Sequence, residues 1–556
     1  MDIYKNLNFL FKFMKTSKLY LILSIVGMVL SVVIITPIPY LIGYTIDNVI
    51  LINKNYTDLY RIVTLITIIY ILNYCFTLFY QYYMSKVQQN VINEIRLSMI
   101  DNIIDSPLHF INSKEKGYIL SRISESQQIG SIFDPNILNS LTGIIDLIGS
   151  LIVMISLNWK LTLLCLIIIP IYYFISKKSS EKISESTVKV HETSAIFNGE
   201  VYEILNGIED IKLLNAKDTH MLKVSSKLRN MMDSVLKQNL NFICFVQNII
   251  IASDIVTVLI LLVSGILILQ NEITVGLYTS FSLYTTKILV AAQSLGTLDI
   301  MVKPVCTTIV RVKEFFNLDK ESSKNSNNLE VNIKSIYFKD VSFKYSDHSE
   351  FIIKEFTEEF KEGDKILLNG PNGSGKTTLV KLITAMYTPT AGCILINGQD
   401  STNFKKESIR EKIGIVSQNI FLFKGTILEN ILYGKKNGTR QDVVNLIKEF
   451  NLDNYINNFE QGIDTKIVQN GMSISGGQAQ IVAFLRAMIG EKNILILDEV
   501  TSNLDIETRR TIINILSKIE KNKILIIISH HDEKIDFINK EIYLENHEHE
   551  LAINYL

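Results

Sequence analysis

A glycine-rich run that ends in lysine and threonine follows a short apolar stretch in the C-terminal half of the chain. The apolar stretch covers residues 365–368, and a helical pattern over residues 379–386 follows the run. This order satisfies the GxxxxGK[ST] pattern in the strand–loop–helix setting that it requires. In such a loop, backbone N–H groups and the positive end of a helix surround phosphate oxygens. The residues of the run are Gly370, Pro371, Asn372, Gly373, Ser374, Gly375, Lys376, Thr377 and Thr378.

The loop and a second strand together predict the chemistry of a nucleoside triphosphate. Lys376 is expected to reach the β- and γ-phosphates, and the Thr377 hydroxyl to ligate Mg²⁺. A second apolar stretch, residues 494–497, ends in Asp498 and Glu499. A strand that carries two carboxylates to the carboxyl edge of a parallel sheet places them beside the phosphates. Asp498 is therefore predicted to hold magnesium, and Glu499 to orient and deprotonate the attacking water.

With these motifs and others, the sequence resembles the ATP-binding cassette (ABC) transporter family. Residues 474–478 (ISGGQ) are similar to the LSGGQ signature, which in this family caps ATP bound to the other subunit. The resemblance implies that Ser475, Gly476, Gly477 and Gln478 contact the nucleotide. Their hydroxyl and unhindered N–H groups at a helix start suit that role.

The resemblance also assigns roles to three further side chains and one segment. It makes Gln418 the Q-loop glutamine, which would contact magnesium and the transmembrane stalks. It makes His530 the switch histidine that touches the γ-phosphate, and residues 502–505 the D-loop. Tyr345 matches the aromatic that stacks on adenine, a use that its π face supports.

The elements that must position these motifs form a distinct C-terminal domain. Short β-rich runs alternate with helical patterns, which predicts an α/β P-loop ATPase domain with a largely parallel sheet. A polar stretch rich in Ser and Asn, residues 318–330, is predicted to be a linker, so the ATPase domain is expected at residues 331–556. The β-rich runs are residues 335–343, 365–368, 393–396, 413–416, 494–497 and 524–528.

The N-terminal part is much more apolar. Hydrophobic residues make up 47% of the chain and charged residues 20%, with a mean hydropathy of +0.24. A bilayer needs about 20 mainly apolar residues per helix. Six apolar runs predict an all-α transmembrane domain of six helices over residues 1–317. The first run lacks the features of a cleavable signal peptide. The runs are residues 19–49, 59–84, 137–157, 161–176, 242–269 and 273–295.

The basic residues predict the orientation of these spans. Lys and Arg concentrate before the first run, between the second and third, and between the fourth and fifth. The connections on the other side carry only Lys54 and Lys160. By the positive-inside rule, both termini, the two large connections and the ATPase domain are expected in the cytoplasm, and the protein in the cytoplasmic membrane.

Two stretches without Gly or Pro predict helices that extend beyond the bilayer. Residues 58–106 and 208–264 contain neither residue type. About 48 helical residues reach roughly 70 Å, more than twice a ~30 Å hydrocarbon core. Pro107 and Gly207 are expected to break these stalks and allow short crosswise segments. Pro37 and Pro39 predict a kink in the first span.

Composition excludes several other classes of protein. A formal net charge of −1 provides no basic field for nucleic acid. The five cysteines lie far apart, without CxxC or histidines at metal spacing, which excludes a disulfide scaffold and a zinc module.

The membrane half fits the exporter type of the family through residues 117–122, 156–160, 207–212 and 273–276. Departures from the family pattern occur at Gln469, Ala479, Ile481 and His531.

Because the signature must complete a partner's site, the resemblance implies a dimer with two ATP sites. A homodimer is expected because one chain carries all motifs, and a heterodimer remains open. The implied function is ATP-driven export of a peptide, drug or lipid; a non-transporting ABC ATPase and an ATP-regulated receptor or channel are the alternatives.

Ionisable and aromatic residues within the predicted spans point to two uses. Asp146, Asp254 and Lys287 either hold helices together as an Asp–Lys pair or face a cavity for a cationic peptide or amphiphile. Four tyrosines of the second span either line that cavity or lie at the membrane interface. They are Tyr70, Tyr74, Tyr80 and Tyr83.

Overall fold

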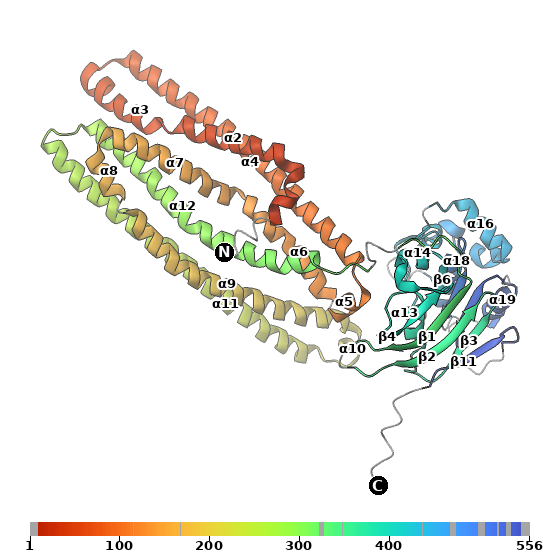
Figure 1. Ribbon diagram of the computed structural model, residues 1–556. Helices are drawn as coiled ribbons and strands as arrows, with labels where there is room; N and C mark the ends of the chain where they lie inside the picture. The colour runs from red at the N-terminus through yellow and green to blue at the C-terminus, as the bar shows by residue number, and fades with distance from the viewer. Residues whose placement is uncertain are drawn as a thin grey trace, which may run out of the picture. The chain divides into compact units, whose positions relative to one another are not determined.

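The computed structural model divides into two compact units. The first consists of Met1–Asn102 and Lys116–Asn317, and the second of Ile103–Glu115 and Leu318–Leu556. Figure 1 shows the first unit as helices in red to green, and the second as an α/β unit in green to blue together with the orange helix that follows residue 103. The structure describes residues 9–114, 116–166, 168–321, 327–346, 349–435, 437–467, 474–498, 506–519, 522–529 and 535–545.

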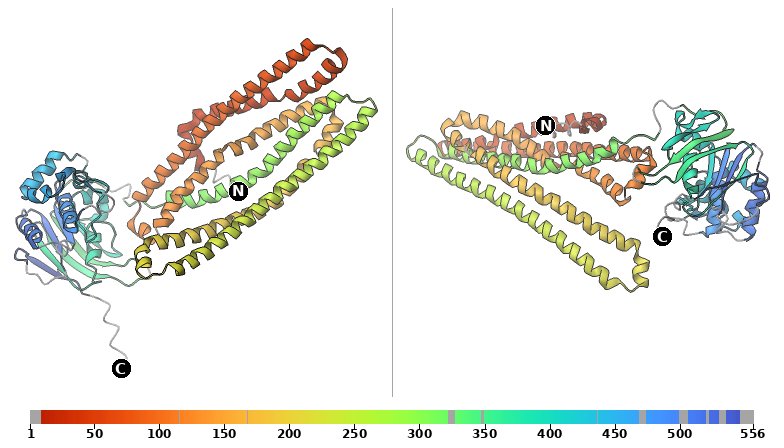
Figure 2. Two further views of the ribbon diagram at one scale, coloured as in Figure 1. Left: turned by 180° about the vertical axis from the view of Figure 1, so that it is seen from behind. Right: turned by 60° about the horizontal axis from the view of Figure 1, so that its bottom comes forward.

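The described part of the first unit is entirely helical. In Figures 1 and 2, α9 runs beside α11, and α7 runs beside α12. Its main helices are α2 (Lys18–Ile35), α3 (Ile38–Tyr44), the π-helix η2 (Thr45–Asn53), α4 (Tyr56–Ile104), α6 (Lys116–Gly130), α7 (Pro135–Leu157), α8 (Trp159–Leu166), α9 (Ile168–Asn206), α10 (Ile208–Leu213), α11 (Lys217–Leu269) and α12 (Val275–Lys313).

Four helical stretches of the described residues are long and apolar enough to cross a membrane. They contain four of the six predicted spans: the first, second, third and fifth. The fourth predicted span is helical on both sides of residue 167, which lies outside the described residues, so α8 and α9 are described as separate helices. The sixth predicted span is helical from Val275 but does not meet the same measure of apolarity. The count of six spans therefore stays a prediction. The four stretches are Lys15–Asn53, Tyr56–Ile104, Gly117–Leu157 and Lys217–Leu269.

The prediction of unusually long helices is confirmed. α4 contains 49 residues and α11 contains 53. At 1.5 Å per residue, each is roughly 75 Å long, more than a hydrocarbon core requires. The breaks lie where Pro107 and Gly207 predicted them, because these residues directly precede the short helices α5 (Leu108–Ser113) and α10.

The two prolines of the first span bend the chain between α2 and α3. Thr36 and Pro37 lie outside both helices but keep helical dihedral angles, with φ −58° and −72°. The Tyr284 hydroxyl of α12 donates a hydrogen bond to Thr36 O at 2.8 Å, and the Ser280 hydroxyl donates to Pro39 O at 2.9 Å. Side chains of a neighbouring helix thus bond carbonyls at the bend.

The second unit contains two main sheets and a small third one. A four-stranded antiparallel sheet has the order β2-β1-β4-β5, and a five-stranded parallel sheet has the order β11-β3-β10-β9-β6. The strands are β1 (Ser335–Phe343), β2 (Ile353–Lys361), β3 (Lys365–Asn369), β4 (Ala391–Ile396), β5 (Gln399–Asp400), β6 (Ile413–Val416), β7 (Gly425–Thr426), β8 (Lys466–Ile467), β9 (Ile494–Asp498), β10 (Ile524–Ile528) and β11 (Lys540–Tyr543).

All six predicted strands are present, but the expectation of one largely parallel sheet is wrong for two of them. β1 and β4 pair with each other in the antiparallel sheet. The burial pattern explains the difference. β9 and β10 are buried along their whole length, as is typical of parallel strands covered on both faces, whereas β1 and β2 include exposed residues.

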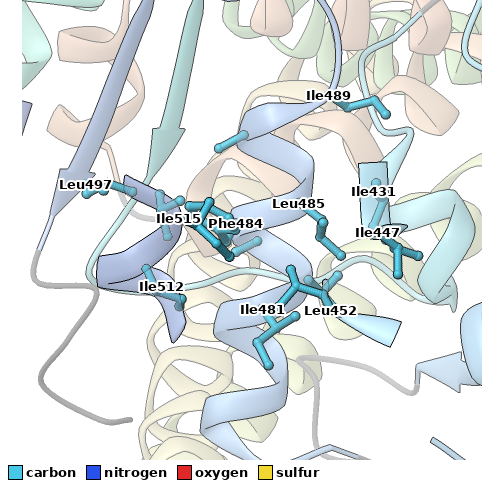
Figure 3. Packing of buried hydrophobic residues seen from close by; sticks show 14 of the residues in the cluster. Ile431, Ile447, Leu452, Ile481, Phe484, Leu485, Ile489, Leu497, Ile512 and Ile515 are labelled. Carbon is cyan, nitrogen blue, oxygen red and sulfur yellow. The ribbon is translucent and has the colours of Figure 1, made fainter. Parts of the chain in front are cut away.

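Helices complete the second unit and build its apolar cores. In Figure 3, Ile481 and Leu485 of α18 approach Ile431, Ile447 and Leu452, while Phe484 lies beside Ile515. The helices are α13 (Lys376–Ile383), α14 (Lys406–Glu411), α15 (Ile427–Ile431), α16 (Arg440–Glu449), α17 (Asp453–Asn457), α18 (Gly476–Met488) and α19 (Ile506–Ser517).

The short helix α5 groups with this second unit. Leu108 packs against the core that includes β3 and α13, and Asn112 Nδ2 donates a hydrogen bond to the Tyr387 hydroxyl at 3.1 Å. Just before the helix, Lys320 Nζ contacts the Asp105 carboxylate at 2.7 Å. The segment after α4 is thus a structural part of the α/β unit.

Candidate nucleotide-binding site

The glycine-rich loop has the predicted strand–loop–helix setting. It leaves buried β3 and ends at Gly375, the N-cap of α13. Gly370 and Gly375 have φ of 147° and 93°, which other residues rarely adopt. A Cβ on Gly370 would lie 2.4 Å from Leu544 O, so the turn also has no room for a side chain.

Lys376 is held inside the loop. Its side chain reaches back so that Nζ donates hydrogen bonds to Gly370 O at 2.6 Å and to Pro371 O at 2.9 Å. The residue is only 6% exposed, whereas Thr377 beside it is exposed. The loop therefore presents a buried ammonium group and an accessible hydroxyl at the same helix start, where the helix dipole favours anions.

Tyr345 lies against the first turn of α13. Its hydroxyl is 3.0 Å from the Thr378 hydroxyl, and its ring packs edge-on against Phe343 and Tyr387 at 5.1 and 5.3 Å between centroids. The residue keeps 40% of its surface exposed. A fixed, partly open ring next to the phosphate loop has the geometry needed to stack on a base.

Strand register brings Asp498 to the same sheet edge as the loop. Ile528 at the end of β10 pairs with Leu368 of β3 on one side and with Asp498 of β9 on the other. Asp498 is 5% exposed. Because all three strands are parallel, the phosphate loop and Asp498 follow strand ends on one edge, where ligands bind in such sheets.

Gln418 follows the neighbouring strand β6 at that edge. Val416 pairs with Leu497, one residue before Asp498, and Gln418 is exposed two residues further on. Asp498, Gln418 and Thr377 would supply a carboxylate, an amide and a hydroxyl oxygen. These hard donors suit Mg²⁺, which takes few protein ligands together with phosphates and water.

The signature segment begins a helix. Ser475 is the N-cap of α18: its hydroxyl accepts a hydrogen bond from Gln478 N at 3.3 Å, and Gln478 Oε1 accepts one from Ser475 N at 2.9 Å. Ser475 and Gly476 are exposed, and a Cβ built on Gly476 would meet no atom of the residues that the structure describes within 4 Å. Gln478 thus caps its own helix, and the open positions are Ser475 and Gly476.

Two of the departures from the family pattern lie on the same helix. Ile481 is 3% exposed within the apolar core of Figure 3, and Ala479 packs against that core. These positions therefore contribute to packing in this chain.

Sequence analysis missed a set of hydrogen bonds that joins α18 to the segment after Gln418. Arg486 donates hydrogen bonds to Phe421 O at 2.9 Å, to Asn430 O at 2.8 Å and to Asn430 Oδ1 at 2.8 Å. Burial lowers the pKa of the Arg486 guanidinium. The available signal was a lone arginine on an otherwise apolar face of the helix that follows the signature.

Several predicted residues lie outside the described residues. They are Glu499 and His530, the D-loop at residues 502–505, and the departures Gln469 and His531. β9 ends at Asp498, immediately before Glu499. β10 ends at Ile528, two residues before His530.

Comparisons with known proteins agree with this geometry. Residues 21–293 match the family model of the ABC transporter transmembrane region, and residues 353–502 match the ABC transporter model. The chain belongs to the ABC transporter family. Two models of this family thus match the two halves of one chain, a membrane part and an ATPase part.

Relatives of this ABC transporter match along nearly its whole length. The uncharacterized ABC transporter ATP-binding protein YfiC of Bacillus subtilis is 28% identical over 95% of this chain and 88% of its own. The putative multidrug export ATP-binding/permease protein YgaD of the same organism is 26% identical over 96% and 94%. A bacterial Atm1-family ABC exporter structure with ATP bound has a TM-score of 0.84 at 21% identity, covering 95% of this chain and 94% of its own.

The membrane half of this ABC transporter contains a cavity. Asp146 of α7 and Lys287 of α12 form an ion pair at 3.1 Å on its wall, which is the pairing that the sequence analysis considered. Tyr70 and Tyr80 line the cavity. Tyr74 and Tyr83 are not among its lining residues, and Asp254 is exposed on α11.

Proposed function

We propose that this chain is one half of an ATP-driven exporter. The observation that carries the proposal is the shared sheet edge, where the phosphate loop, Asp498 and the segment leading to Gln418 follow neighbouring parallel strands. Relatives named as multidrug export proteins match over both halves, which supports coupling of this site to transport.

We infer that the working unit is a dimer with two composite ATP sites. Ser475 and Gly476 stand exposed at the start of α18, and no described residue crowds Gly476. Exposed hydroxyl and N–H groups at a helix start can receive the phosphates of a nucleotide held by another copy. A homodimer needs no further chain, because each copy brings both the loop and the signature.

The proposed hydrolysis divides its tasks among this chain's residues. Lys376 and the loop N–H groups hold the phosphates, and Tyr345 stacks on adenine. Asp498, Thr377 and Gln418 hold magnesium, which supplies charge neutralisation to the phosphates when bound. Glu499 orients and deprotonates the attacking water, and His530 contacts the γ-phosphate. ATP binding then closes two ATPase domains, and the long helices pass this change to the membrane half.

Export from the cytoplasm follows from the orientation that the basic residues predict. The ATPase domain, both termini and the large connections would face the cytoplasm, and the chain would lie in the cytoplasmic membrane as a multi-pass protein. Peptides, amphiphilic drugs and lipids are the substrate classes considered. An ATP-regulated receptor or a non-transporting ATPase would lack coupled movement of substrate.

Glu499→Gln is the variant that tests this proposal. In inside-out vesicles, the wild type should hydrolyse ATP and accumulate at least one member of a panel of peptides, lipids and cationic drugs. Glu499→Gln should lose both activities but retain ATP binding, because only the base is removed. Exposed Glu491→Gln is the matched control and should behave as wild type. Retained turnover in Glu499→Gln would refute the assigned base, and hydrolysis without uptake would favour the receptor.

A further inference from the structure

A cavity of about 610 Å³ lies within the membrane unit, between α2, α3, α4, α7 and α12. Its volume is in the range of small-molecule sites, which is roughly 300–1,000 Å³. Asp146 and Lys287 face each other on its wall, with side chains 22% and 20% exposed. Both charges of the pair are thus accessible from the cavity.

The rest of the wall combines uncharged polar groups with apolar ones. Asn73 and Thr77 of α4 lie one helical turn apart on the same face, and Asn139 of α7 adds a second carboxamide. The Thr142 and Thr286 hydroxyls donate to carbonyls of their own helices at 2.8 and 3.0 Å, so their oxygens remain able to accept. Apolar lining residues include Val32, Ile35, Ile38, Ile42 and Val290.

The ion pair determines which charges this wall accepts. Asp146 and Lys287 are its only formally charged lining residues among those the structure describes, so the wall has no net charge. A ligand with a single charge would bind one partner and leave the other without its counter-ion at membrane depth, which is costly. A zwitterion exchanges one ion pair for two and leaves every charge paired.

We propose that the Asp146–Lys287 pair is a binding site for zwitterionic, partly apolar substrates, with the ligand's ammonium at Asp146 and its carboxylate or other anion at Lys287. This inference rests on the proposed export function and specifies its substrate class. It replaces the expectation of a cationic substrate, because Lys287 already occupies the carboxylate that a cation would need.

One dipeptide in four end-capping states tests the proposal. Leucyl-phenylalanine is a zwitterion; its amide is a cation, its N-acetyl form an anion, and its N-acetyl amide is neutral. We would measure equilibrium binding of the four tritiated forms to the purified full-length protein in nanodiscs, without ATP. The zwitterion should bind about tenfold more tightly than either singly charged form. The difference in binding free energy that this ratio represents is a modest share of the energy of one ion pair in a partly buried setting.

Variants of the pair should shift this preference in opposite directions. Lys287→Met leaves Asp146 alone and should make the cationic amide the best ligand. Asp146→Asn leaves Lys287 alone and should favour the anionic form. The exchanged pair, Asp146→Lys with Lys287→Asp, should again prefer the zwitterion. This crossover would not arise if the pair only held α7 and α12 together.

The outcomes separate this inference from the export proposal. Equal binding of the four forms, binding of none, or a preference that the variants leave unchanged would overturn the zwitterion site. Should single variants fail to fold, the ranking of the four forms by the wild type still decides. ATP hydrolysis in the same nanodiscs tests the export proposal independently, since it does not depend on which form binds.

Discussion

The ring and the hydroxyl of Tyr345 have different surroundings, so the proposed stacking of Tyr345 on adenine can be tested separately from its hydroxyl contact. Its hydroxyl lies 3.0 Å from Thr378 in the first turn of α13, while 40% of the residue is open to solvent. Base stacking uses the ring face and not the hydroxyl. Removing the ring and removing the hydroxyl should therefore have different effects.

We expect Tyr345→Ala to weaken ATP binding about tenfold, because stacking of one base on an aromatic ring contributes ~1–3 kcal/mol. Tyr345→Phe keeps the ring and should change the Kd for ATP by less than about threefold. Fluorescence titration with a labelled ATP analogue measures both. Equal loss in the two variants would show that the hydroxyl, and not the ring, is what matters.

Lys376 is expected to have a larger effect. Lys376→Ala removes a buried ammonium that bonds two loop carbonyls and would otherwise face phosphate oxygens. ATP affinity should fall at least about tenfold, since charge-assisted bonds to phosphate are among the strong ones. Lys466→Ala, an exposed lysine on β8, is the control in the same titration and should bind as wild type. Unchanged affinity in Lys376→Ala would contradict the site.

Which features of the candidate site could be predicted from sequence depended on how far apart the residues involved lie along the chain. The local settings of the loop, Asp498 and Ser475, at strand ends and a helix start, could be predicted because each follows from adjacent residues. Arg486 and Asn430 could not, because they are 56 residues apart and only the folded chain brings them together. The family resemblance had assigned Gln478 to nucleotide binding. In the structure its side chain caps the start of α18.

Among the elements, α12 makes a notably close contact with the end of the first span. Gly276 of α12 faces Gly43 of α3, and a Cβ on Gly276 would lie 2.2 Å from Gly43 O and 2.4 Å from Asp47 Cγ. Asp47 accepts hydrogen bonds from Thr274 Oγ1 at 2.5 Å and Gly276 N at 2.8 Å. The two backbones approach closely because neither glycine has a side chain, as is typical of helix contacts in membranes.

Gly276→Ala should therefore destabilise the protein. The added methyl group forces these elements apart, and overpacking of this kind costs about 1–3 kcal/mol. We expect a thermal unfolding midpoint in nanodiscs that is several degrees lower. Gly265→Ala on α11 is the matched control, since a Cβ built there would have no atom of the described part of the chain within 4 Å. Alanine favours the helix there, so its midpoint should be unchanged or higher.

Element types were easier to predict from sequence than their partners. Long helices were correctly identified, because residues 58–106 and 208–264 contain neither Gly nor Pro. The break between α10 and α11 was missed, since Asn215 adopts a positive φ of 50° without being a glycine. The sixth predicted span is less apolar because α12 carries Thr286, Lys287 and Ser294 on the cavity wall. The pairing of β1 with β4 was missed, since a β-rich run does not by itself reveal the direction of its neighbour.

For the whole molecule, the account requires two copies. Each loaded nanodisc should exceed the mass of an empty disc by twice the mass of the 63.4 kDa chain, as measured by mass photometry. The same sample should hydrolyse ATP. An inactive single copy would instead indicate that a different half-transporter completes the site.

The most direct test asks whether the loop of one copy and the signature of another share one nucleotide. Two differently tagged copies, both with Glu499→Gln to prevent turnover, are co-purified, and bound ATP is counted after gel filtration. Lys376→Ala disables a loop, and Gly476→Asp places a carboxylate at the signature, where a Cβ on Gly476 would meet no atom of the described residues within 4 Å.

The two arrangements of these changes give opposite results. With the changes on different copies, one site keeps both an intact loop and an intact signature, so about half of the wild-type ATP should remain bound. With both changes on the same copy, each site has one defect and no ATP should remain. The reverse pattern, with ATP retained only when one copy carries both changes, would contradict a site shared between two copies.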